Sequence, residues 1–169
     1  MPKINFLSFS GYITNIEDYP APPSENSGCQ KFITVQNEDG LIVNFIADPQ
    51  TYFLHHERVS VGDFITGYYD GDRPVILIYP PQYQALIIVK ESPFERVAVD
   101  YFDENLVSND GILQLNVSFE TQIHLTNGQA FTQSVAERNL IVRYGPTTKS
   151  IPALTSPYEI IVYCRFQTF

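Results

Sequence analysis

Short apolar runs separated by turn residues form the basic pattern of this chain. Lys31–Gln36 and residues 41–47 flank the sequence Asn-Glu-Asp-Gly, and two such runs joined by a turn ending in glycine are typical of a β-hairpin. Residues 85–90 are almost wholly apolar, which predicts a strand buried on both faces. No window of about 12 residues keeps the 3.6-residue period of an amphipathic helix, so the pattern predicts an all-β fold.

The remaining elements follow from alternation and from proline. Residues 4–16 alternate between apolar and polar side chains, as in a strand with one buried face, and Gly11 allows a bulge or sharp bend there. The prolines among residues 17–30 predict an exposed loop. Residues 50–57 are expected to form a short helical turn. Further strands are expected at residues 64–69, 75–79, 97–102, 112–119, 121–125, 139–144 and 158–164.

The second half of the chain repeats this order. Residues 61–90 read as a strand, an Asp-Gly turn, a proline-rich crossing and a closing strand, and residues 139–164 follow a similar order. Aligning them places Ile65 on Ile141 and Ile87 on Ile160. The pattern predicts an internal duplication, with units at residues 1–92 and 93–169. The alternative, in which unrelated β units share common turns and strands, stays open.

Composition agrees with a β fold that has real cores. Of 169 residues 44% are hydrophobic, and 12 are Phe and 11 are Tyr, which suit a pleated, half-buried surface. A unit of about 80 residues buries only a small core. The two units are therefore expected to pack on each other or on partners.

The net charge limits the partners. A net charge of −9, with ten scattered Lys and Arg residues, repels a phosphate backbone, so nucleic acid is not an expected partner. The start of the chain lacks the features of a cleaved signal peptide, and no run reaches the roughly 18 apolar residues of a membrane span. The sequence predicts a cytoplasmic protein, or one on a cell or spore surface reached without a cleaved signal.

Catalytic and metal-binding motifs are weak in this sequence. Adjacent His55 and His56 diverge on a strand or a helix, and Arg73-Pro74 breaks a calcium-loop reading of Asp70-Gly71-Asp72. We therefore expect no enzyme activity, no cofactor and no metal site. Cys29 and Cys164 are either free thiols or one bridge, within a subunit or between subunits.

Two resemblances extend this interpretation. The segment V-G-D-F-I-T-G-Y at residues 61–68 is similar to the entry into strand four of many OB-folds. That resemblance implies two tandem small antiparallel β-barrel or sandwich units, OB-like and packed together. The strings I-Y-P-P-Q-Y-Q-A-L-I-I-V and I-V-R-Y-G-P-T-T-K-S-I-P resemble an uncharacterised family of small β-rich proteins from anaerobic Gram-positive bacteria. This second resemblance implies no activity.

Two functional hypotheses follow. The first is a structural protein that self-assembles into a filament or ring through its apolar ends, with assembly segments at Ile4, Phe6, Phe9, Tyr163, Phe166 and Phe169. The second is an OB-like module that binds a glycan or peptide on an aromatic platform, formed by Tyr68, Tyr83, Tyr144 and Tyr158. For these tyrosines, ordinary packing within sheets is the alternative.

Overall fold

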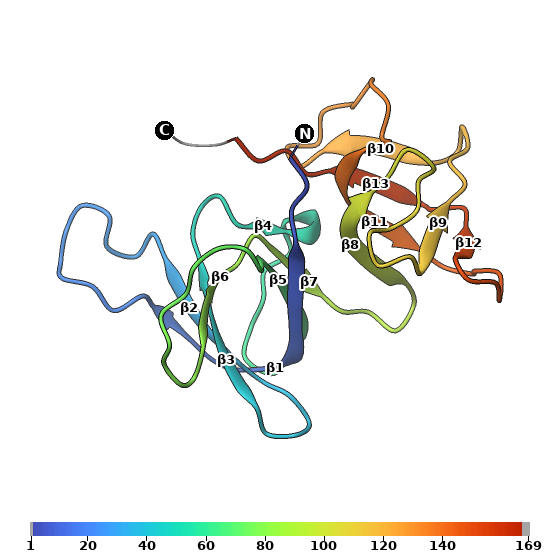
Figure 1. Ribbon diagram of the computed structural model, residues 1–169. Helices are drawn as coiled ribbons and strands as arrows, with labels where there is room; N and C mark the ends of the chain where they lie inside the picture. Colours follow the sequence, from blue (N-terminus) through green and yellow to red (C-terminus); the bar gives the residue numbers. More distant parts are fainter. Residues whose placement is uncertain (1, 167–169) are drawn as a thin grey trace. The chain divides into compact units, whose positions relative to one another are not determined.

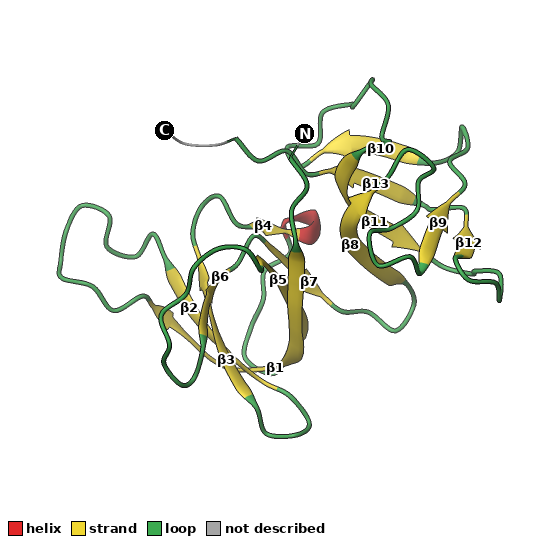
Figure 2. Ribbon diagram, viewed as in Figure 1, coloured by secondary structure: helices red, strands yellow, loops and turns green. Residues whose placement is uncertain are grey.

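The computed structural model describes residues 2–166, and it is an all-β fold with several sheets (Figure 1, Figure 2). The chain divides into two compact units. The first unit comprises residues 6–91, and the second comprises residues 92–166 together with residues 2–5. The start of the chain thus lies in the second unit, whereas the sequence placed it in the first. No helix among the described residues is long and apolar enough to span a membrane.

The first unit is one sheet of seven strands, in the order β4-β7-β5-β1-β2-β3-β6. A single 3-10 turn, η1 (Leu54–His56), follows β4 and matches the expected short helical turn. The strands are β1 (Phe6–Asp18), β2 (Lys31–Gln36), β3 (Ile42–Ala47), β4 (Tyr52–Phe53), β5 (Phe64–Asp70), β6 (Gln82–Gln84) and β7 (Ile87–Lys90). The hairpin at β2 and β3 and the buried strand at β7 confirm the sequence-based expectations.

The long strand β1 pairs with β5 over its first half and with β2 over its second half. Gly11 permits this, because a Cβ atom there would lie 2.5 Å from the carbonyl oxygen of Gln36. The register shift of the strand falls between Ile13 and Asn15. Gly11 therefore provides a close approach of two backbones, and the bulge lies just beyond it.

The second unit contains a four-stranded sheet in the order β10-β13-β11-β8 and a separate two-stranded sheet. The smaller sheet pairs β9 (Leu113–Leu115) with β12 (Ala153–Thr155). The larger sheet consists of β8 (Arg96–Phe102), β10 (Gln122–Leu125), β11 (Arg138–Tyr144) and β13 (Glu159–Val162). Each unit has its own core, and the largest fully buried side chain is Phe45 in the first and Phe102 in the second.

The sequence suggested two tandem antiparallel barrels or sandwiches. The strands do not form two equivalent units of this kind. Four neighbouring pairs are parallel (β3 with β6, β4 with β7, β9 with β12, and β10 with β13), a feature of β-solenoids. The second unit also lacks a strand at the position that β2 occupies beside β1. The reason is local: the Asp103 carboxylate accepts hydrogen bonds from the backbone N–H groups of Asn105 (2.9 Å) and Val107 (3.0 Å), which turns the chain just after β8.

In each unit, the hydroxyl of one threonine makes the same pair of hydrogen bonds to the backbone. The Thr51 hydroxyl donates to the Ala85 carbonyl (2.9 Å) and accepts from the Asp48 N–H (3.1 Å). The Thr121 hydroxyl donates to the Pro157 carbonyl (3.0 Å) and accepts from the Ser118 N–H (3.3 Å). The two units therefore share a detail of side-chain chemistry as well as the order of four strands, β4-β7-β5-β1 in the first and β10-β13-β11-β8 in the second.

The strand registers correct the alignment of the two halves by one residue. Ile65 lies opposite Lys90, the last residue of β7, and Leu140 lies opposite Val162, the last residue of β13. Ile65 therefore corresponds to Leu140 rather than to Ile141. The shift escaped the sequence because both strands are continuous apolar runs, in which neighbouring positions look alike.

We expect Gly67→Ala to lower the free energy of unfolding by about 1–3 kcal/mol, because the new methyl group overpacks the core. A Cβ atom at Gly67 would lie 2.4 Å from the Phe45 ring. Chemical denaturation measures the loss. Phe45→Leu makes room for the methyl group, so the double variant should lose less than the sum of the two single losses. A strictly additive result would show that Gly67 and Phe45 do not compete for this space.

Candidate functional site

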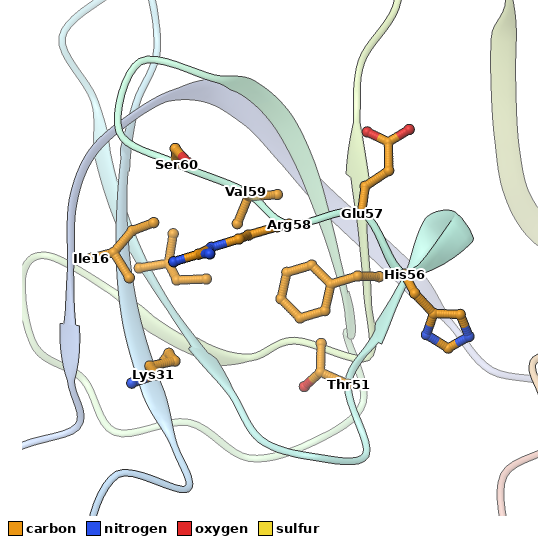
Figure 3. A pocket seen from close by; sticks show the side chains of 10 residues that line it. Ile16, Lys31, Thr51, His56, Glu57, Arg58, Val59 and Ser60 are labelled. Atoms are coloured by element: carbon orange, nitrogen blue, oxygen red, sulfur yellow. The ribbon is translucent and has the colours of Figure 1, made fainter.

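A cavity of about 580 Å³ opens in the first unit, beside the chain that links β4 to β5 (Figure 3). Its lining comes from three stretches of sequence, in β1, in β2 and at residues 51–60, so only the fold brings these residues together. The lining residues are Ile16, Lys31, Ile33, Thr51, Phe53, His56, Glu57, Arg58, Val59 and Ser60.

The inner part of the cavity is mostly apolar. Ile33 is fully buried in the first core, and Ile16, Phe53 and Val59 pack against that core while remaining partly exposed. Thr51 is also buried, and both its hydrogen bonds are made within the fold. The interior therefore offers hydrocarbon and aromatic surface, with its polar groups already satisfied.

The mouth of the cavity carries two cations. Lys31 forms an ion pair with Asp18. Arg58 has no anionic partner among residues 2–166. Figure 3 shows the Arg58 side chain extending toward Ile16, whereas the Glu57 carboxylate and the His56 ring extend away from the hollow. The charge facing the cavity is therefore positive, although the chain as a whole is acidic.

Unusual backbone geometry leads into this mouth. His55 (φ 56°, ψ 22°) and His56 (φ 55°) both adopt the left-handed conformation without being glycine. Such residues cost on the order of 1 kcal/mol or more each and persist where the surrounding structure enforces them. The reversal sends residues 57–60 across the cavity. Among the described residues, no group of three or more His, Cys, Asp or Glu side chains gathers closely enough to hold a metal ion.

Two tyrosines of the first unit stack on each other, but Tyr83 stacks on Tyr69 and not on Tyr68, which the sequence analysis had placed in the platform. Tyr69 and Tyr83 lie parallel, with ring centroids 3.8 Å apart and an interplanar angle of 6°. Burial and a hydrogen bond to Tyr83 raise the pKa of the Tyr69 phenol to about 12. Neighbouring residues on a strand face opposite sides, so Tyr68 on β5 does not take part in this stack.

In the second unit, Tyr144 packs against the core, while the side chain of Tyr158 is 44% exposed. The Arg143 guanidinium lies over the Tyr158 ring, 5.4 Å from its centroid. Gly145 makes this placement possible, because a Cβ atom there would lie 2.1 Å from the Tyr158 hydroxyl. Tyr158 also borders a second hollow of about 470 Å³, with Ser118, Glu120, Gln122, Arg143, Ser156 and Pro157.

A buried carboxylate holds the strands around Tyr158 together. Glu159 on β13 contacts the His124 Nε2 atom (2.9 Å) and the Arg143 Nε atom (3.2 Å). Arg143 also pairs with Glu95 (2.6 Å). Sequence reasoning missed this cluster, because its residues are far apart in the chain and each lies in an ordinary strand or loop.

Most of the residues expected to drive assembly are used within the fold. Ile4 is buried, and its N–H group donates to the Asn139 side chain (3.1 Å). Phe6 and Phe9 lie in β1. Tyr163 is buried, and Phe166 is 89% exposed. Phe169 lies outside the described residues.

The two cysteines are free thiols in this structure. Cys29 is exposed in the loop between β1 and β2. Cys164 is half-buried and packs against the second core. The structure contains no bond between them.

The largest continuous run of exposed apolar residues lies where the sequence predicted a strand. Val75, Ile76, Leu77, Ile78 and Tyr79 form a loop without sheet partners, and Leu77 is 98% exposed. Pro74 precedes this run and Pro80-Pro81 follows it. The local pattern is that of a strand, but no strand among residues 2–166 pairs with this run, and the flanking prolines limit it to five residues.

Comparison of the chain with protein-family models, with curated proteins and with solved structures gives no match.

We expect Glu159→Gln to lower the free energy of unfolding by about 1–3 kcal/mol, because it weakens two charge-assisted contacts of a buried group. Urea denaturation near pH 7 measures this loss. Glu120→Gln, which removes an exposed carboxylate from the same unit, should change stability much less. Equal effects of the two substitutions would contradict a stabilising role for the Glu159 cluster.

Proposed function

We propose that this chain is a non-enzymatic structural protein whose copies join through β-strand contacts into a filament or ring. The observation that carries the proposal is the exposed segment at residues 75–79. Five consecutive apolar residues, uncharged and rich in β-branched side chains, match the composition of segments that add to open sheet edges. The flanking prolines limit any added strand to these residues.

A suitable acceptor lies in the second unit. Strand β8 is an edge strand whose only partner strand among residues 2–166 is β11, and an isolated bridge between Phe102 and Ser108 covers the end of its other side. On its other side, the Tyr101 carbonyl accepts a hydrogen bond from the Asn109 N–H (2.8 Å). Backbone groups two residues apart point the same way, so those of Val97 and Val99 face this side too. No strand among residues 2–166 pairs with them there.

Joining a donor in the first unit to an acceptor in the second unit of another copy gives a head-to-tail contact. Such contacts propagate into a filament or close into a ring. Cys29 and Cys164 lie in different units, so a bridge between them in neighbouring copies would reinforce the same arrangement. The proposed setting is the cytoplasm or a cell or spore surface.

Leu77→Asp tests the proposal. A charge in the middle of the donor strand should abolish assembly, because it cannot be buried beside the acceptor without a partner. Light scattering coupled to size-exclusion chromatography gives the size of the particles. Phe119→Asp is the matched control, since Phe119 is also 98% exposed but lies outside the segment.

The proposal fails if the unsubstituted protein stays monomeric at every concentration, or if both variants assemble equally well. Repeating the measurement with a reductant shows whether disulfide bonds contribute to the assembly. Particles that shorten on reduction indicate bridges through Cys29 and Cys164. Particles that keep their length show that strand contacts alone hold the copies together.

A second candidate function is a module that binds a glycan or peptide, and the hollow around Tyr158 favours it. An exposed ring with hydroxyl, amide and carboxylate groups around it is the composition of many sugar sites. We expect Tyr158→Ala to weaken binding to an immobilised glycan or peptide array by about tenfold, given about 1–3 kcal/mol for a lost stacking contact. Tyr12→Ala, which changes an exposed tyrosine in the first unit, should leave array binding intact. Equal losses would argue against the Tyr158 site.

We further propose that the first unit is an OB-like barrel rather than a coil of a β-solenoid. Strands β6 and β7 pair at opposite sides of the sheet, with β3 and with β5, yet only Ala85 and Leu86 separate them. A connection this short between strands near the two opposite edges of the sheet favours closure of the sheet into a barrel. The shared pair of threonine hydrogen bonds supports an origin of both units by duplication. Membership of the Gram-positive family stays a proposal from sequence resemblance.

A further inference from the structure

We propose that the cavity of the first unit binds a small amphipathic monocarboxylate. Its carboxylate would lie against Arg58 and Lys31, and its hydrocarbon or aromatic body would lie against Ile33, Phe53 and Val59. This site is separate from the exposed segment at residues 75–79 and from Tyr158. Ligand binding in this cavity would therefore be a property additional to the proposed structural role, and it does not depend on assembly.

The size and lining of the cavity define the body of the ligand. A volume of about 580 Å³ falls within the roughly 300–1,000 Å³ typical of small-molecule sites. The apolar walls are Ile33, which belongs to the first core, and Ile16, Phe53 and Val59, which pack against it. Because the polar groups of Thr51 are already paired with Asp48 and Ala85, they do not call for a polar ligand body.

The charges define the head group. The chain has only ten Lys and Arg residues, and two of them line this one cavity. Arg58 has no anionic partner within residues 2–166, and a guanidinium presents two parallel N–H groups to a carboxylate. Lys31 is already partly neutralised by Asp18. One free positive charge in an acidic protein favours a single negative charge over a phosphate group with two.

The mouth is held in place before any ligand arrives. The chain that connects β4 to β5 forms this mouth. The left-handed pair His55-His56 reverses the chain at the start of this link, and hydrogen bonds hold the end of the link against β1. There the Ile13 N–H donates to the Asp63 carbonyl and the Gly62 N–H donates to the Ile13 carbonyl, each at 2.9 Å. The Ser60 N–H donates to the Asp63 carboxylate at 2.8 Å. A link fixed at both ends loses little freedom on binding, which favours affinity for a small ligand.

Nuclear magnetic resonance titration of the full chain tests the proposal. Benzoate and hexanoate serve as probes, benzyl alcohol as an uncharged probe with the same ring, and inorganic phosphate as an anion without an apolar body. We expect the two carboxylates to shift the amide signals of Ile33, Phe53 and Val59 in a saturable way. Benzyl alcohol and phosphate should bind about tenfold more weakly or not at all.

Variants separate the charge from the cavity. Arg58→Gln should raise the dissociation constant for benzoate about tenfold, and Arg58→Lys should raise it less, because the charge remains but the paired donors do not. Arg73→Gln removes an exposed arginine that does not line the cavity, and it should leave the constant unchanged. Amide spectra of each variant without ligand check that it is folded.

Three results would overturn the inference. The first is that neither carboxylate shifts the cavity signals. The second is that benzyl alcohol binds as tightly as benzoate, which would leave an apolar cavity without a carboxylate site. The third is that Arg58→Gln and Arg73→Gln weaken binding equally, which would indicate a general effect of charge. Light scattering on the same samples reports assembly separately, so failure of this site leaves the structural proposal intact.

Discussion

The first unit depends on the ability of one strand, β1, to take part in two pairings. At Tyr12 the strand lies opposite Phe64 on one side and Gln36 on the other, and Gly11 beside it leaves room for the Gln36 backbone. The curl of β1 separates the part that packs against β5 from the part that borders β2. The cavity lies beside that second part, since Ile16 from β1 and Ile33 from β2 both line it. A side chain at Gly11 would disturb the sheet and the cavity together.

Sequence reasoning succeeded where a local pattern is tied to one physical cause. The hairpin at residues 37–40 follows from a turn that needs a positive φ, and Gly40 supplies it with φ 80°. The buried strand β7 follows from an uninterrupted apolar run. The strand expected at residues 75–79 failed because burial is a property of the whole sheet. An apolar run between prolines has the local pattern of a strand, but that pattern does not show whether a neighbouring strand is available to pair with it.

The candidate sites were harder to predict for the same reason. Arg58 and Lys31 lie far apart in the sequence, and neither belongs to a motif. Their common position depends on the left-handed conformation of His55 and His56, which are not residues that favour it. Tyr83 was identified, but its partner was expected on the wrong side of β5. The strand alternation that selects Tyr69 rather than Tyr68 depends on a register that the sequence alone does not fix.

The exposed run around Leu77 places two forces of different range against each other. Apolar contact acts only when two molecules touch, whereas the repulsion between two chains of net charge −9 acts at a distance. That repulsion reaches about 30 Å at 0.01 M salt but only about 8 Å at 0.15 M. If copies join through this run as proposed, dilute buffer would oppose the contact by preserving the repulsion, and ionic strength would control association without a ligand or a change of shape.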